Sequence, residues 1–212
     1  MLDARARRVL SPGLDAAGRR LADLGIPALA VTAAGWVVGV GACCAVVAHA
    51  WPLALALWLL NRLLDGLDGP IARRRGPSDL GGFLDIVADF SVYSGFVVAV
   101  AIAEPDARLA CLALLMAYYL SGTAFLALSS LLERRGTDLA ADGRSLRFVG
   151  GVAEGTETVV VYVLLCLLPS RATLIVWLFT AAVMVTAAQR IVLGVHVLRR
   201  PATTSNKHQE SR

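Results

Sequence analysis

The chain has 212 residues, of which 57% are hydrophobic and 17% are charged, and its formal net charge is +4. A soluble domain is about 45–50% apolar and about one quarter charged, so this composition excludes an ordinary soluble protein and indicates one integral membrane domain. The net positive charge does not indicate nucleic-acid binding, because the arginines lie beside long apolar runs. The cysteines fall inside those runs without CxxC spacing, which excludes a typical zinc site.

Residues 1–25 are expected to form an amphipathic helix before the first apolar run. Ser11 and Pro12 suit the start of a helix, and Gly25 with Pro27 suits its end. The apolar stripe of this helix consists of Leu10, Leu14, Ala17, Leu21 and Leu24. A basic amphipathic helix next to a span is typical of the membrane interface. A short solvated helix is the alternative interpretation.

Six apolar runs follow, each close to the roughly 20 residues that a helix needs to cross the hydrocarbon core. They cover residues 28–49, 51–69, 80–103, 107–131, 148–168 and 172–198. The predicted fold is therefore all-α, a bundle of six transmembrane helices within residues 26–200 that follows the N-terminal interfacial helix. The small polar residues of 201–212 predict a disordered tail.

Arginine and lysine residues are distributed unequally between the two sides of the predicted bundle. The side with both termini also receives the arginines of 73–75 and 134–147, whereas the other side receives only Arg108 and Arg171. Basic residues favour the cytoplasmic side of a membrane protein. We therefore expect both termini, and the connection between the second and third runs, to be cytoplasmic.

Four aspartates flank that cytoplasmic connection. Asp65 and Asp68 are three residues apart at the end of the second run, and Asp85 and Asp89 are four apart at the start of the third. Residues at these spacings share one face of a helix, and the short connection makes the two helices antiparallel, so the acidic faces can meet. Clustered carboxylates repel one another unless a cation holds them, and oxygen ligands suit Mg²⁺ or Mn²⁺.

Small residues and one arginine accompany the aspartates. Gly69, Ala72 and Gly81 lie on or beside the acidic faces and leave space for a ligand, and Arg73 can bind a phosphate group. The stretch therefore indicates a site for a phosphate-containing ligand. Pro70 lacks a backbone N–H and disfavours helical backbone before it, so the helix is expected to kink or end near Gly69.

The pattern D-x-x-D-G-x-x-A-R-x7-G-x3-D-x3-D in this stretch resembles the signature of the CDP-alcohol phosphatidyltransferase family. Its eight positions are Asp65, Asp68, Gly69, Ala72, Arg73, Gly81, Asp85 and Asp89. The six apolar runs and the N-terminal helix also resemble that family. The flanking segments NRLLDGLDG and GGVAEGTET are similar to a bacterial subgroup, which implies a multi-pass protein of the bacterial inner (plasma) membrane.

The resemblance implies an enzyme of phospholipid biosynthesis that acts as a homodimer. Such an enzyme transfers a substituted phosphate from a CDP-linked donor, commonly CDP-diacylglycerol, to an alcohol and releases CMP. By the same resemblance Asp65, Asp68 and Asp85 are metal ligands for Mg²⁺ or Mn²⁺, with two ions in all. Asp89 joins the second metal and acts as the catalytic base. The implied donor-binding residues are Gly69, Ala72, Arg73 and Gly81.

The fifth run contains two acids whose role the residues leave open. Glu154 and Glu157 are three apart and are expected to face the bundle interior. They pair with Arg190 or Arg62, contact the acceptor alcohol, or add a metal ligand. An acceptor such as glycerol phosphate or inositol phosphate needs positive charge, for which Arg144, Arg147 and Arg190 are candidates. The two glutamates instead favour an amino alcohol, such as serine, or an uncharged polyol.

Two other functions are consistent with buried acids in a membrane bundle. An ion or small-solute transporter would place them along a path near the bilayer midplane, whereas here they gather at one face beside an arginine. A catalytically silent scaffold would not need the eight filled positions. The sequence therefore favours the transferase.

Overall fold

The computed structural model describes residues 2–135 and 155–199, and these residues form helices and no strand. The α-helices are α1 (Leu2–Asp23), α2 (Ala28–Val47), α3 (Trp51–Arg75), α4 (Asp79–Ala103), α5 (Arg108–Arg134), α6 (Gly155–Leu167) and α7 (Ala172–Arg199). Two short 3₁₀ helices, η1 (Pro105–Ala107) and η3 (Pro169–Arg171), precede α5 and α7. The all-α prediction is confirmed. The predicted tail and residues 148–154 of the fifth apolar run lie outside the described residues.

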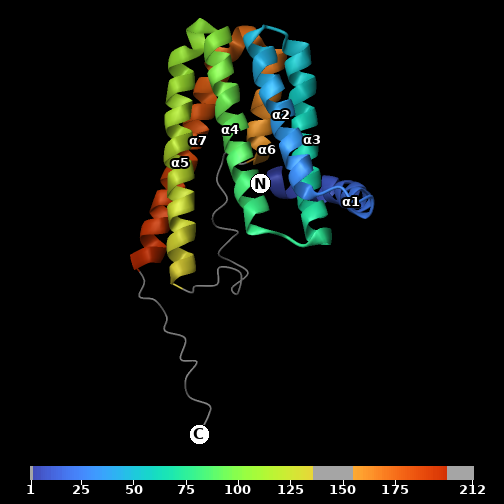
Figure 1. Cartoon of the computed structure of the whole chain (residues 1–212). Coiled ribbons are helices and arrows are strands. Elements are labelled where there is room, and N and C mark those ends of the chain that lie inside the picture. The colour runs from blue at the N-terminus through green and yellow to red at the C-terminus, as the bar shows by residue number, and fades with distance from the viewer. Residues whose placement is uncertain (1, 136–154, 200–212) are drawn as a thin grey trace.

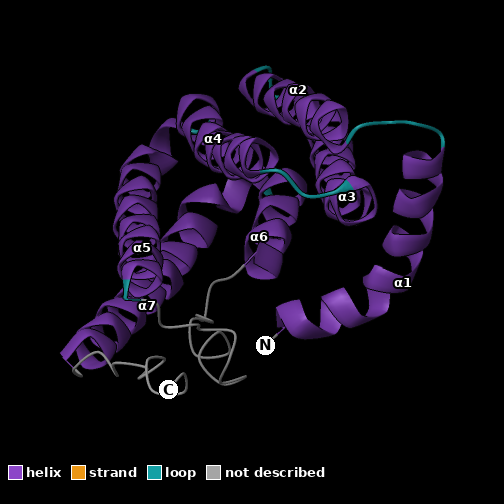
Figure 2. Cartoon of the chain, turned by 60° about the horizontal axis from the view of Figure 1, so that its bottom comes forward, coloured by secondary structure: helices purple, strands orange, loops and turns teal. Residues whose placement is uncertain are grey.

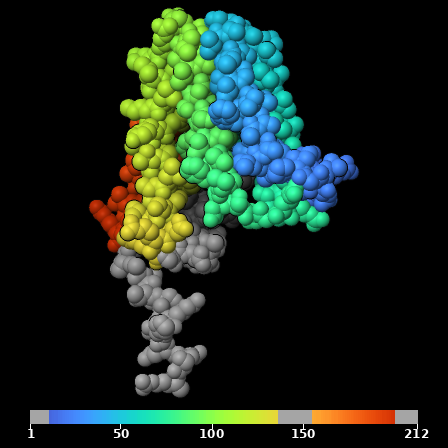
Figure 3. Space-filling model, viewed as in Figure 1, coloured from blue at the N-terminus to red at the C-terminus, as the bar shows by residue number. Residues whose placement is uncertain are grey.

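Helices α2 to α7 run side by side as a bundle, and α1 lies across the lower part of α3 (Figure 1). The space-filling view shows α1 projecting from the side of the bundle (Figure 3). Within residues 2–135 and 155–199, four stretches are long and apolar enough to cross a membrane: 28–47, 79–103, 105–134 and 169–199. Helix α3 carries several charges and α6 is described over only 13 residues. The count of six spans therefore stays a prediction.

Helix α1 differs from its predicted start. The helix begins at Leu2 and continues through Pro12, so Ser11 is not its N-cap. A proline inside a helix removes one backbone hydrogen bond and commonly bends the helix, and α1 is visibly bent (Figure 2). Its predicted end is correct, because Gly25 has a positive φ of 88°. Leu14 and Leu21 pack with a small cluster on α2 and α3 that includes Val31 and Ile71.

Helix α3 also continues past its predicted end. The expectation was a kink or an end near Gly69, and the helix does not end there, because it reaches Arg75 with Pro70 inside it. The ring of Pro70 lies against α1, where a Cβ added to Gly18 would stand 2.5 Å from the proline Cβ. The glycine thus allows α1 to approach α3 at the helix turn that follows Asp68.

The core receives buried side chains from α2 to α7, and its largest fully buried side chains come from α3, α4 and α6. Trp58, Phe96 and Tyr162 are fully buried, and the rings of Phe96 and Tyr162 are stacked with centroids 4.5 Å apart. The Tyr162 hydroxyl donates a hydrogen bond of 2.8 Å to the backbone oxygen of Tyr93. Large apolar side chains such as Leu178 are exposed on the outside of the bundle, as expected for surfaces in contact with lipid.

Close packing of α2 at Gly39 gives a first prediction. A Cβ at Gly39 would lie 2.6 Å from Val92 Cγ2 and 2.9 Å from Asn61 Nδ2. Because overpacking a tight core costs about 1–3 kcal/mol, Gly39→Ala is expected to lower the thermal unfolding midpoint in detergent. Gly41→Ala on the same helix is the control, since its Cβ would meet Leu57 Cδ1 at an ordinary 3.5 Å. Equal midpoints for the two variants would contradict the packing described here.

Candidate functional site

The four aspartates lie on α3 and α4, near the end at which a short loop joins these helices. Helix α2 packs against both α3 and α4 and so closes the space between them on one side. Ser78 begins α4 by accepting a hydrogen bond of 3.1 Å from the backbone N–H of Gly81. A Cβ at Gly81 would stand 2.9 Å from that serine hydroxyl, so glycine keeps the cap intact.

Three of the four aspartates form one group. Asp65, Asp68 and Asp85 each offer a carboxylate oxygen, and these oxygens lie within 4.8 Å of one another. The group borders a small cavity of about 10 Å³, which has room for about one water molecule. The prediction that the two acidic faces meet is thus supported for these three side chains.

The group fits a divalent metal ion. Its ligand atoms are all carboxylate oxygens, and among the described residues no histidine or cysteine belongs to it. Hard cations such as Mg²⁺ and Mn²⁺ prefer oxygen ligands. Asp68 is only 8% exposed, and a buried carboxylate requires a cation or hydrogen bonds to compensate for lost hydration. The donor chemistry and the burial therefore both suit a bound divalent cation.

Helix α2 supplies a contact that the sequence did not indicate. The hydroxyl of Thr32 donates a hydrogen bond of 2.9 Å to Oδ2 of Asp68, and its oxygen also lies 3.2 Å from the backbone oxygen of Ala28, a second possible acceptor for the same proton. Thr32 therefore fixes the orientation of the most buried carboxylate of the group. Hydrogen bonds of this kind tune metal affinity in known metal sites.

Asp89 lies at the same cavity but has a different partner. Its Oδ1 accepts a hydrogen bond of 3.0 Å from Nη2 of Arg62, and Nη1 of the same arginine lies 3.4 Å from Oδ2 of Asp65. The Arg62 guanidinium thus contacts two of the motif acids, and the pairing of Glu154 or Glu157 with Arg62 or Arg190 stays a prediction. Local spacing hints at the contact with Asp65, since the two residues are one helical turn apart.

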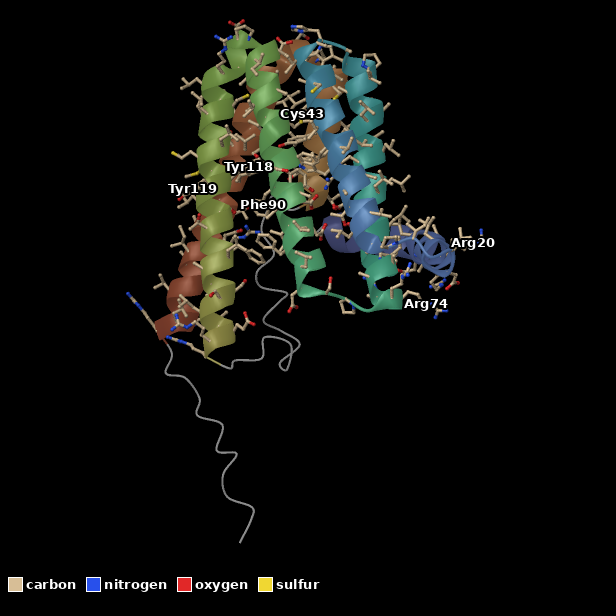
Figure 4. The ribbon with its side chains drawn as sticks, viewed as in Figure 1. Arg20, Cys43, Arg74, Phe90, Tyr118 and Tyr119 are labelled. Carbon is tan, nitrogen blue, oxygen red and sulfur yellow. The ribbon has the colours of Figure 1, made fainter. Side chains whose placement is uncertain are left out.

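The donor-site candidates lie on the same two helices. Gly69 is one residue after Asp68, and a Cβ there would meet Nη1 of Arg73 at 3.4 Å. The exposed guanidinium of Arg73 forms an ion pair of 3.0 Å with Asp15 of α1, so α1 reaches the edge of the site. Arg74 forms a second ion pair with α1 (Figure 4). Ala72 is half-buried on α3.

A second, larger cavity of about 620 Å³ lies between α4, α5, α6 and α7. Its polar lining includes Tyr93, Ser94, Tyr118, Thr158 and Arg190. Phe90, Tyr118 and Tyr119 also line it, from α4 and α5 (Figure 4). Tyr93 links the larger cavity to the acids through Arg62, because its hydroxyl accepts a hydrogen bond of 2.6 Å from that arginine.

The structure places one acceptor candidate in the larger cavity. Nη1 of Arg190 donates hydrogen bonds of 2.8 Å and 3.2 Å to the hydroxyl and backbone oxygen of Ser121, and its guanidinium lies 5.2 Å from the ring centroid of Phe125. Glu157 lies in the first turn of α6. Glu154 and Arg147 lie outside the described residues.

Comparison with known proteins identifies a family that the chain matches. The model of the CDP-alcohol phosphatidyltransferase family matches residues 26–188. The chain is 38% identical over 205 residues to the inner membrane protein YnjF of Escherichia coli (strain K12), covering 94% of this chain and 98% of that protein.

A solved structure shares the fold. It is the phosphatidylinositol phosphate synthase PgsA1 of Mycobacterium tuberculosis with CDP-DAG bound. The TM-score is 0.65 and the identity 20%, with 85% of this chain and 92% of that chain covered.

Proposed function

The chain belongs to the CDP-alcohol phosphatidyltransferase family, and from this membership we propose that it transfers a phosphatidyl group from CDP-diacylglycerol to an alcohol in phospholipid biosynthesis. The observation that carries the proposal is the group of three carboxylates, Asp65, Asp68 and Asp85, with Asp89 at the same cavity. The related solved protein has CDP-DAG bound, which supports the same class of donor here.

The proposed donor site is the α3–α4 end of the bundle. Gly69, Ala72 and Gly81 border the CDP group, because residues this small let backbone and ligand approach closely. Arg73 neutralises phosphate charge from the edge of the site, where its side chain is exposed enough to exchange Asp15 for a phosphate oxygen. The exposed apolar faces of the bundle accommodate the acyl chains.

The proposed reaction is a displacement at the phosphorus that carries the diacylglycerol. Asp89 removes the proton of the acceptor hydroxyl, the hydroxyl oxygen forms a bond to that phosphorus, and the bond to the CMP oxygen breaks. Asp65, Asp68 and Asp85 would hold one Mg²⁺ or Mn²⁺, and Asp89 would join a second. Bound divalent ions would neutralise charge on the phosphates and on the leaving CMP.

The proposed acceptor site is the larger cavity, with Arg190, Arg147, Glu154 and Glu157 as its selecting residues. The cavity adjoins the acids through Tyr93, which lines it and binds Arg62. A mixed lining of hydroxyl groups and a cation suits a small polar alcohol. The charges of these four residues would determine whether the preferred alcohol is negatively charged, positively charged or uncharged.

Replacing Arg190 tests this assignment. Arg190→Gln is expected to raise the acceptor KM by about tenfold or more, because a lost charged hydrogen bond costs about 1.5–3 kcal/mol, while the KM for CDP-diacylglycerol stays unchanged. Steady-state kinetics with the preferred acceptor provide the measurement. Arg171→Gln, at the opposite end of the bundle, is the control. An equal change in both KM values would contradict a role in acceptor binding.

We also propose that the protein is a homodimer with its termini and its site at the cytoplasmic face. The proposed orientation rests on the arginines near the α3–α4 loop and the predicted membrane side of both termini. Cysteine labelling from the two sides of sealed vesicles measures it.

A CMP-release assay tests the proposed activity. Purified protein is incubated with CDP-diacylglycerol and Mg²⁺ or Mn²⁺, with a panel of alcohols that includes glycerol 3-phosphate, inositol phosphate, serine and uncharged polyols. Release of CMP with one alcohol and not the others is the expected result. No release with any alcohol, from protein that remains folded, would overturn the lipid donor. Ion flux into proteoliposomes that depends on Asp65 would instead favour transport.

A further inference from the structure

Arg62 is largely buried and held by more contacts than an arginine in a surface ion pair. Its side chain is 10% exposed, and its guanidinium lies 4.8 Å from the ring centroids of both Trp58 and Tyr93. Nε donates a hydrogen bond of 2.8 Å to Oδ1 of Asn61, whose Nδ2 in turn donates to the backbone oxygen of Gly35 at 2.8 Å. These contacts hold the arginine beside the acids without any contribution from the acids themselves.

The remaining nitrogens of the guanidinium reach the acids. Nη2 donates to Asp89 at 3.0 Å, and Nη1 lies 3.4 Å from Asp65. An arginine stays charged in proteins, so it is a permanent cation at this position. Asp89, the acid that contacts it most closely, is also the one acid of the four that lies outside the group of three carboxylates.

A second divalent ion bound at Asp89 would meet this fixed cation. The Oδ1 atom of Asp89 already accepts from Arg62, and two cations on one carboxylate repel each other. Of the three acids that would hold the first ion, Asp65 lies 3.4 Å from Arg62, and Asp68 and Asp85 form no ion pair with an arginine among the described residues. The first ion therefore keeps two carboxylates that Arg62 does not contact. Arg62 thus opposes the second ion more strongly than the first, because it lies closer to Asp89 than to Asp65.

We infer that Arg62 and the second divalent ion compete for Asp89, so that the chain without its donor binds one ion tightly and a second weakly. This inference rests on the proposed function and adds to it the order in which the site fills. Arg62 is a positioning residue in this account, since it holds Asp89 and does not contact the reacting groups. Asp89 is free to act on the acceptor only after Arg62 releases it.

Titration of the purified full-length chain with Mn²⁺, in detergent and without donor, tests the inference. Electron paramagnetic resonance of free Mn²⁺ counts the bound ions. Arg62→Gln is expected to bind the second Mn²⁺ about tenfold more tightly than the unchanged protein, a difference of about 1.4 kcal/mol. Arg62→Lys keeps the charge and is expected to resemble the unchanged protein. Arg74→Gln, which removes an exposed arginine paired with Asp23, is the control.

The possible results separate this inference from the proposed function. Identical isotherms for the unchanged protein and Arg62→Gln, with one ion lost in Asp85→Asn, would overturn the competition and leave the metal site standing. No Mn²⁺ binding by the unchanged protein would overturn both. If Arg62→Gln does not stay monodisperse, Arg62→Met replaces it, because methionine fills the space between two aromatic rings without a charge.

Discussion

Asp89→Asn is expected to reduce CMP release by about 10²- to 10⁴-fold, the range that a positioned general base contributes. Asparagine keeps the size of the side chain, and its amide oxygen can still accept the hydrogen bond that Arg62 donates to Asp89. It cannot take a proton from the acceptor hydroxyl. The measurement is the initial rate of CMP release with saturating donor and acceptor.

The matched control for this variant is Asp79→Asn. Asp79 is an exposed aspartate in the first turn of the same helix, and it lies outside the cavity that the four motif acids share. The Asp79 variant is expected to keep its full rate. An Asp89→Asn variant that is folded and retains more than about a tenth of the rate would rule out Asp89 as the base, since a base contributes more than that.

Asp68→Asn is expected to weaken Mn²⁺ binding by about 100-fold or more and to remove CMP release with it. Losing a ligand should cost at least as much as losing a hydrogen-bonded neighbour of a ligand, which costs about 10- to 100-fold in metal affinity. The amide oxygen can keep the hydrogen bond from Thr32, so the fold should persist. Mn²⁺ titration followed by electron paramagnetic resonance provides the affinity.

Thr32→Val tests the hydrogen bond to Asp68 separately from the Asp68 carboxylate itself. Valine has nearly the shape of threonine but cannot donate to Asp68, so an intermediate loss of about 10- to 100-fold in Mn²⁺ affinity is expected. The predicted order of affinities is the unchanged protein, then Thr32→Val, then Asp68→Asn. An Asp68→Asn variant that binds Mn²⁺ as tightly as the unchanged protein would show that the ion lies elsewhere.

The sequence predicted the features that local spacing determines. Long apolar runs predicted the helices, and their bounds agree within a few residues for α2, α4, α5 and α7. The three- and four-residue spacing of the aspartates placed each pair on one helix face, and three of the four side chains do meet. The regular helix period makes such predictions possible.

The contacts that complete the site were not predictable in this way. Thr32 is 36 residues from Asp68, and Arg62 is 27 residues from Asp89; only the packing of α2, α3 and α4 brings them together. Pro70 was predicted to kink or end a helix that continues to Arg75. Tertiary contacts stabilise the helix there, since Pro70 packs against α1 at Gly18. Local propensity does not include such contacts.

The most direct test of the proposed function measures both products of one reaction. The purified protein is given CDP-diacylglycerol, Mn²⁺ and the alcohol preferred in the acceptor panel, and CMP and new phospholipid are quantified together by mass spectrometry. Transfer predicts equal amounts of the two products, and neither product when a chelator removes the ion. CMP formed without a new phospholipid, or phospholipid formed equally well after chelation, would contradict a metal-dependent phosphatidyltransferase.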